Sequence, residues 1–252
     1  MQTGTQLVGV VAALGTAAAG DHHPGGGHAG QARQADQLPG DAHRFRTLPA
    51  VSTTILALDE AVTTASTGDL WLFRGRSVAD RAIRTVTNSP VNHVGMVVAL
   101  DDLPPLLWHA ELGRSQPDVW TGAHQRGVQL HRLTDAVATW RERYGQRGWV
   151  RLLDGRIERH HEDRLMEAID RFDGRPFPTT LGLARQWVNG RLRRHTSLEA
   201  VYCAELVAAT YQHMGLLPAR RPASWYDPGS FWSGDALALA PPFSLSGEIP
   251  VT

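Results

Sequence analysis

The sequence contains no lysine and only one cysteine. All 25 basic residues are therefore arginine, which fits a high-GC coding bias better than a functional demand, because charge usage alone does not define a site. A single thiol excludes an intramolecular disulfide and a zinc site built from several cysteines. The chemistry of the lone Cys203 must be judged from its surroundings.

An excess of charge is also absent, since 25 acidic residues balance the 25 basic ones. This balance gives no electrostatic basis for nucleic acid as the main partner. The apolar stretch from Leu7 to Ala19 is too short to span a membrane as a helix, so membrane association is not indicated. The stretch resembles a signal-peptide core without the usual cationic start, because the first arginine is Arg33. A cytoplasmic and a secreted or cell-envelope location both stay open, and the oligomeric state is undetermined.

The composition changes near residue 45. Residues 1–45 include a stretch rich in Gly, His and Gln, and we expect them to form a flexible, low-complexity segment. Residues 46–252 are expected to form one globular domain, since a chain of this size can bury a substantial core. The adjacent His160 and His161 are expected on a solvated helix face and not in a metal site.

Hydrophobic periodicity predicts an α+β fold in which helices flank a small antiparallel sheet. An aromatic-rich segment, 225–232, is expected to be an irregular loop. The predicted helices are 50–64, 77–87, 134–144, 162–172 and 197–217, and the predicted strands are 70–73, 94–100, 106–110, 128–133 and 149–153.

Cys203 is the candidate nucleophile. It lies near the start of the last predicted helix, where the helix dipole and free backbone N–H groups can stabilise a thiolate and an oxyanion. A single cysteine on a helix is also commonly a small buried apolar residue, so this position alone does not establish a nucleophile.

His93 is the candidate base, because it opens an apolar strand from which its ring can project. A base works better when a third group orients its imidazole. His109 and Glu111 lie two residues apart on the next strand, so both face the same side, and either could bind the far nitrogen of His93. The spacing does not choose between them.

Four motifs, taken in order, resemble a known superfamily. They are Gly68-Asp69-Leu70-Trp71-Leu72-Phe73, Asn92-His93-Val94-Gly95-Met96-Val97, Trp108-His109-Ala110-Glu111 and Tyr202-Cys203-Ala204-Glu205-Leu206-Val207. Together they resemble the circularly permuted branch of the papain-like NlpC-type superfamily, in particular its YiiX-like amidases and more distantly the lecithin:retinol acyltransferase group. The resemblance spans about residues 66–232.

This resemblance implies a permuted papain-like fold and a cysteine hydrolase that cleaves an amide of the peptide or cell-wall-peptide type. Cys203 takes the nucleophile position, His93 the base position and His109 the third position, with Glu111 as the alternate. Two other functions stay open: a thiol acyltransferase or lipid hydrolase with the same triad, and a non-catalytic binding domain. The expected partner is a small-molecule, peptide or acyl substrate, and neither a metal nor an organic cofactor is expected.

Overall fold

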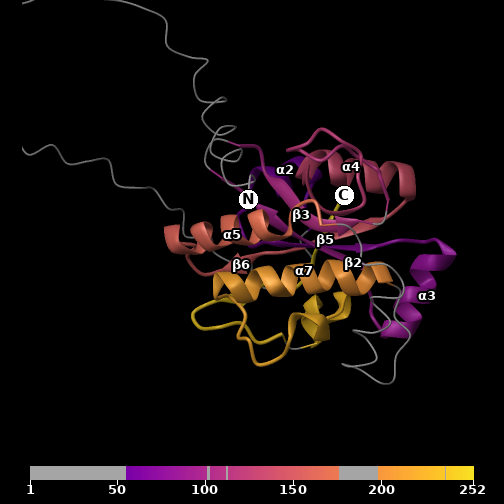
Figure 1. The fold of residues 1–252 in the computed structure, drawn as a ribbon. Helices are drawn as coiled ribbons and strands as arrows, with labels where there is room; N and C mark the ends of the chain where they lie inside the picture. The colour runs from indigo at the N-terminus through magenta and orange to yellow at the C-terminus, as the bar shows by residue number, and fades with distance from the viewer. Residues whose placement is uncertain (1–54, 101–102, 112, 176–197, 236) are drawn as a thin grey trace, which may run out of the picture. The chain divides into compact units, whose positions relative to one another are not determined.

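The computed structural model describes residues 55–100, 103–111, 113–175, 198–235 and 237–252. These residues form an α+β fold with a six-stranded antiparallel sheet flanked by helices (Figure 1), which confirms the predicted fold class. Residues 1–45 lie outside the described part of the chain, so the domain boundary near residue 45 stays a prediction. No helix within the described ranges has the length and apolar character needed to cross a membrane.

The main sheet has the strand order β4-β3-β2-β1-β5-β8, and every neighbouring pair is antiparallel. The short strands β6 and β7 pair separately. The strands are β1 (Leu70–Arg74), β2 (His93–Val98), β3 (Leu106–Glu111), β4 (Gly127–Arg132), β5 (Arg147–Arg151), β6 (Leu153–Asp154), β7 (Ser244–Leu245) and β8 (Ile249–Val251).

The helices follow the predicted order with shorter or shifted ends. They are α2 (Leu58–Thr63), α3 (Val78–Thr87), α4 (Leu133–Tyr144), α5 (Arg159–Phe172) and α7 (Leu198–Met214). Ser77 caps α3, since its hydroxyl accepts from the Asp80 N–H and the Asp80 carboxylate accepts from the Ser77 N–H. The aromatic-rich segment 225–232, expected to be irregular, contains a short 3-10 turn at Pro228–Phe231, and two more turns, Ala223–Trp225 and Ser233–Asp235, lie at its two ends.

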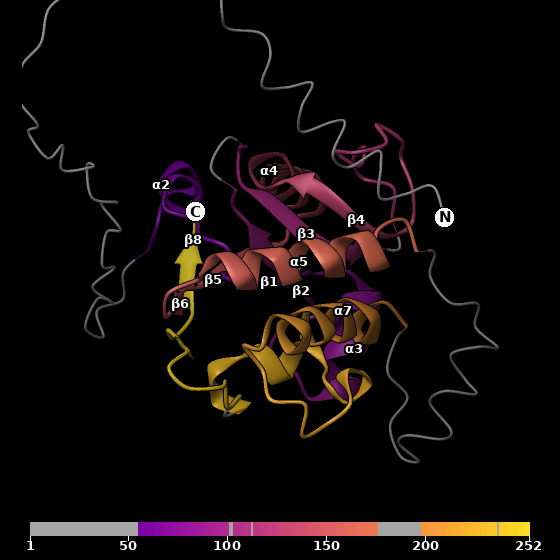
Figure 2. The ribbon, with the colours of Figure 1, turned by 60° about the vertical axis from the view of Figure 1, so that its left-hand side comes forward.

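Side chains on the two faces of the sheet form two separate apolar clusters. Val94, Met96 and Trp108 belong to the cluster that includes α7, whereas Val97 and Leu107 belong to the cluster that includes α4. Figure 1 and Figure 2 show α4 and α7 on opposite sides of the sheet. Because side chains alternate along a strand, each position on β2, β3 and β4 is assigned to one of these two faces.

The turn before β1 is held by a buried carboxylate. The Asp69 side chain accepts a hydrogen bond from the Ser66 N–H at 2.9 Å and another from the buried Leu153 N–H at 2.8 Å. The Tyr211 hydroxyl donates to the Gly68 carbonyl, which ties α7 to the same turn. The Asp69 carboxylate thus satisfies a backbone donor 84 residues away in the chain.

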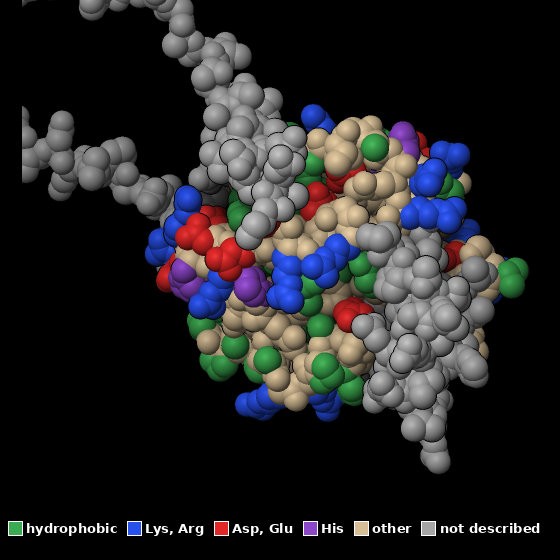
Figure 3. Space-filling view, in the orientation of Figure 1, with side chains coloured by type: hydrophobic (Ala, Val, Ile, Leu, Met, Phe, Trp, Pro, Cys, Tyr) green, Lys and Arg blue, Asp and Glu red, His purple; other side chains and the backbone are tan. Residues whose placement is uncertain are grey.

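Basic and acidic side chains of the described residues are interspersed on the face seen in Figure 3. This mixed distribution agrees with the zero net charge of the whole sequence.

Candidate functional site at a buried histidine cluster

Five polar side chains lie on one face of the sheet, on three neighbouring strands. They share the side of Val97 and Leu107, the side that α4 covers, because they occupy the same alternating positions. All five are buried, and three of them have no exposed surface. The set consists of His93 on β2, His109 and Glu111 on β3, and Gln129 and His131 on β4.

The start of β2 is held in place by Asn92. Its side-chain oxygen accepts from the Gly75 N–H at 2.7 Å, and its side-chain nitrogen donates to the Asp80 carboxylate at 3.0 Å. These bonds tie the residue before His93 to the loop after β1 and to the first turn of α3. The backbone that carries His93 is therefore fixed on its β1 side, whereas the His93 ring meets His109 on the β3 side.

The three histidines form a continuous chain of hydrogen bonds. His93 Nε2 lies 3.3 Å from His109 Nδ1, and His109 Nε2 lies 3.0 Å from His131 Nδ1. A neutral imidazole donates through one nitrogen and accepts through the other. The direction of one hydrogen bond in the chain therefore fixes the direction of the other and the tautomer of all three rings. If His93 donates from Nε2, its Nδ1 carries the lone pair; in the reverse direction, the lone pair lies on His131 Nε2.

Aromatic side chains cover this chain. The centroid of the Trp140 ring, from α4, lies 5.0 Å from the ring centroids of both His93 and His109, in edge-to-face contact. The indole N–H donates to Ser115 Oγ at 3.2 Å, and that hydroxyl donates to Glu111 Oε2 at 2.9 Å. Trp140 therefore shields the histidines while its polar edge connects to the carboxylate beside them.

Burial keeps all three rings neutral near pH 7. Desolvation lowers the pKa of His93 to about 3. Desolvation lowers the pKa of His131 to about 4, although the nearby Asp118 carboxylate acts in the opposite direction. The pKa of His109 is lowered well below its usual value by burial first and then by His131 and His93. A neutral imidazole is the form that can accept a proton or bind a metal.

Several buried polar atoms beside the chain have no hydrogen-bond partner in the described part of the protein. They are His131 Nε2 and both polar atoms of the Gln129 side chain. Gln129 lies directly across the strand pair from His109. Because an unpaired buried polar atom is costly, three such atoms beside one cluster indicate a site that a ligand or water completes.

Cys203 lies elsewhere in the fold. Its side chain has no exposed surface and belongs to the same apolar cluster as Val94 and Met96, on the α7 side of the sheet. His93 contacts Phe73 and Trp140, which belong to the cluster on the α4 side. The structure thus brings His93 and His109 together but assigns Cys203 to the other face, so the pairing of Cys203 with His93 stays a prediction.

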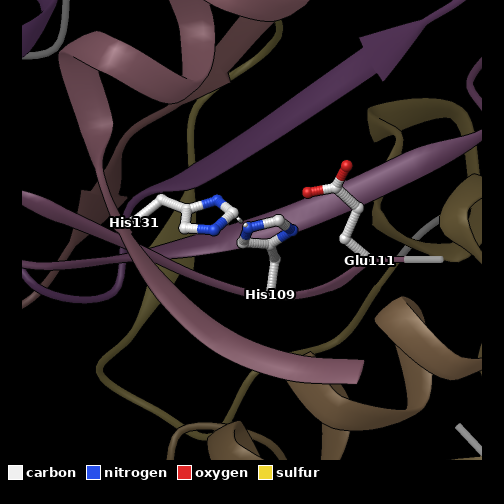
Figure 4. A group of neighbouring side chains, drawn as sticks. All are labelled: His109, Glu111 and His131. Atoms are coloured by element: carbon white, nitrogen blue, oxygen red, sulfur yellow. Dashed lines mark hydrogen bonds between the residues drawn. The ribbon is translucent and has the colours of Figure 1, made fainter. Parts of the chain in front are cut away.

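Of the two residues proposed to orient His93, His109 is the one whose ring nitrogen lies within hydrogen-bonding distance of it. The Glu111 carboxylate accepts from Ser115. Glu111 also belongs to a second grouping with His109 and His131, whose ligand atoms all lie within 4.8 Å of one another. Figure 4 shows the two rings side by side and the Glu111 carboxylate directed toward His109.

His131 was not among the site residues predicted from the sequence. His131 alternates with Val128 and Leu130 along β4, so it faces the opposite side of the sheet from them. It becomes part of a site only because that side of the sheet is covered as well. Of the adjacent His160 and His161, His160 is exposed as expected, whereas His161 differs from expectation. Their ring centroids are 3.7 Å apart, and His161 is buried, with its Nδ1 accepting from the Glu158 N–H at the start of α5.

Comparison with known proteins gives only weak similarity, to solved structures. No family model matches the chain, and no curated protein matches it. A solved structure of the metalloprotein yiiX from Escherichia coli O157:H7 is 23% identical, with a TM-score of 0.40. The match covers 60% of this chain and 66% of that one, and it is too weak to assign a family.

Proposed function

We propose that this protein is a cysteine-dependent hydrolase that cleaves an amide bond, with Cys203 as the nucleophile and His93 as the base. The observation that carries the proposal is the 3.3 Å hydrogen bond between His93 Nε2 and His109 Nδ1, formed between two buried rings. Since Nε2 of His93 is engaged, Nδ1 is the nitrogen left for proton transfer. A base oriented by a third group is the arrangement that activates a thiol.

The proposed reaction has two halves. His93 Nδ1 takes the proton of the Cys203 thiol, and the sulfur attacks the carbonyl carbon of the amide. The C–N bond then breaks as the leaving amine takes the proton from His93, and the acyl group remains on sulfur as a thioester. Water, deprotonated by His93, attacks the thioester and releases the carboxylic acid and the free thiol.

This reaction requires the sulfur to approach His93 at the end of the sheet. His93 is the first residue of β2, and α7 packs against β2, so we propose that the sulfur approaches past the strand end and not through the sheet. The order of the four motifs, from the His93 segment to the Cys203 segment, also supports the proposal. Peptide or cell-wall-peptide amides are the proposed substrates, on the basis of the motif resemblance alone.

Alkylation of the only thiol tests the proposal. We expect Cys203 in the folded protein to react with iodoacetamide with an apparent pKa below the value of about 8.5 for a free thiol. His93→Ala should slow this reaction at neutral pH by at least about tenfold. His213→Gln is the control, because His213 is an exposed histidine on the same helix as Cys203 and pairs with Glu167 at 2.9 Å.

Turnover completes the test. Cys203→Ala should abolish hydrolysis in a panel of peptide amides while thermal unfolding changes little. Reaction of Cys203 only in denaturant, or undiminished hydrolysis by Cys203→Ala, would refute the proposal. Turnover of acyl esters alone would reassign the substrate to the acyltransferase or lipid-hydrolase class, and a wild-type protein inert to both panels would support the binding-domain alternative.

A further inference from the structure

The geometry points to a metal site that is separate from the proposed nucleophile. We propose that His109, Glu111 and His131 bind a divalent transition-metal ion of the zinc type. Two imidazoles and one carboxylate form a ligand set that suits zinc and its neighbours in the first transition row. The three residues lie on the paired strands β3 and β4, which hold their backbones in fixed register.

The distances agree with a shared ion. The ligand atoms of the three residues all lie within 4.8 Å of one another. His109 Nε2 and His131 Nδ1 are 3.0 Å apart. Two nitrogens bound to one tetrahedral zinc at about 2.0–2.1 Å are separated by about 3.3 Å, so the rings need to move apart by only about 0.3 Å.

The hydrogen bond that His109 donates to His93 supplies the outer support that a metal-bound histidine usually has. With the ion on His109 Nε2, the other ring nitrogen carries the hydrogen and donates it to His93 Nε2 at 3.3 Å. The Ser115 hydroxyl donates to Glu111 Oε2 at 2.9 Å and orients the carboxylate in the same way. Two of the three ligands therefore have hydrogen-bonded partners that fix their orientation.

The unpaired Gln129 side chain provides an independent indication. It is fully buried, lies across from His109 on the same face, and has both polar atoms without a partner among the described residues. Three protein ligands leave a coordination position for water, and a buried amide beside it can hydrogen-bond to that water. Water bound to the ion would thus give the Gln129 side chain a partner that the described part of the protein does not supply.

Charge also favours an ion here. Both ligand rings are fully buried, which favours the neutral imidazole that a metal binds. The Glu111 carboxylate offsets part of the positive charge of a divalent ion in this poorly solvated place. Cys203 takes no part, since it belongs to the cluster on the other face of the sheet.

Equilibrium dialysis of the full chain against Zn²⁺ tests the site, with Co²⁺ absorption as a second readout of coordination by nitrogen and oxygen. We expect the wild type to bind one more equivalent than Glu111→Gln, or to bind that equivalent at least about 100-fold more tightly. His131→Gln should lose the same equivalent. Unfolding in EDTA verifies that each variant is folded, and Glu111→Gln answers the question even if His131→Gln does not fold.

Two controls make the outcome specific. The double variant His160→Gln/His161→Gln removes another close histidine pair, with ring centroids 3.7 Å apart, and should keep the site. Cys203→Ala should also bind the ion fully, so failure of the cysteine mechanism and failure of the metal site give different results. Equal zinc binding by the wild type, Glu111→Gln and His131→Gln would overturn the proposal.

Discussion

Lowering the pH from 7 to 5 should destabilise this protein through its buried histidines, and the variant His131→Gln should remove part of that loss. In the unfolded chain a histidine titrates near 6.5. In the folded protein the pKa of His93 is lowered to about 3 and that of His131 to about 4. Between these values and 6.5 the unfolded state binds more protons, so stability is complete above about pH 6.5 and falls as the pH decreases toward the folded values.

The size of the effect follows from the two shifts. At pH 5 an unfolded histidine is almost fully protonated, whereas His93 and His131 stay largely neutral in the folded state. Each then lowers the free energy of unfolding by about 2 kcal/mol, and the two together by about 4 kcal/mol. This is a large fraction of the roughly 5–15 kcal/mol that stabilises a typical domain. His109 acts in the same direction, since its pKa is also lowered.

Urea unfolding followed by tryptophan fluorescence measures this loss, and eight tryptophans supply the signal. The measurement compares pH 7.5 with pH 5.0 in the presence of EDTA, so that metal binding does not contribute. The charge of Asp118 raises the pKa of His131, and the charge of His124 lowers it. The difference between wild type and His131→Gln cancels groups far from the substitution.

We expect the pH-dependent loss in His131→Gln to be smaller than in the wild type by about 2 kcal/mol. His124→Gln is the control, because His124 is an exposed histidine and has the smallest of the named effects on the pKa of His131, so this variant should keep most of the loss. An identical loss in the wild type and in His131→Gln would mean that His131 binds protons equally in both states. The conclusion that burial holds the cluster neutral would then be wrong.

Three further predictions concern neighbouring groups. The pKa of Asp173 is raised to about 7, first by burial and then by the charge of Asp118, so the free energy of unfolding decreases as the pH rises from 3.8 to 7. Asp173→Asn should therefore be more stable than the wild type in urea unfolding at pH 8, and equal stability would contradict this. Asp118→Ala should lower the free energy of unfolding by about 3 kcal/mol, because its buried carboxylate accepts from the N–H groups of Trp120, Thr121 and Leu130, whereas Asp163→Ala, in an exposed ion pair, should have a much smaller effect. If both proposals hold, saturating Zn²⁺ should slow alkylation of Cys203 in the wild type but not in Glu111→Gln. An ion on His109 Nε2 directs the His109 hydrogen to His93 Nε2, which leaves His93 Nδ1 protonated and unable to take the thiol proton. Equal alkylation rates with and without Zn²⁺ in the wild type would mean that the metal site does not act on His93.

Periodicity in the sequence determined most of the local structure. Alternation in 128–133 and the apolar runs in 70–73, 94–100 and 106–110 predicted four strands of the sheet, and the helical spacing of 134–144 predicted α4. These elements depend on contacts between residues close in the chain, so their patterns are visible without the fold. The contact between Ser77 and Asp80 that caps α3 in the structure is also local.

Short elements escaped prediction because they depend on distant partners. The strand expected at 149–153 is divided between β5 and β6, which pair with β8 and β7 from the C-terminal end of the chain. β7 and β8 contain two and three residues. Runs this short carry no period of their own, and only pairing with β5 and β6 makes them strands.

The candidate site divides in the same way. The two-residue spacing of His109 and Glu111, and the place of His93 on the preceding strand, were sufficient to predict that these side chains share a face of neighbouring strands. Only the tertiary structure decided that α4 covers this face, that His131 joins it from β4, and that Cys203 belongs to the cluster on the other side. The physical reason is that alternation separates the two faces of a strand, but the helix that packs on each face is chosen by contacts between residues far apart in the chain.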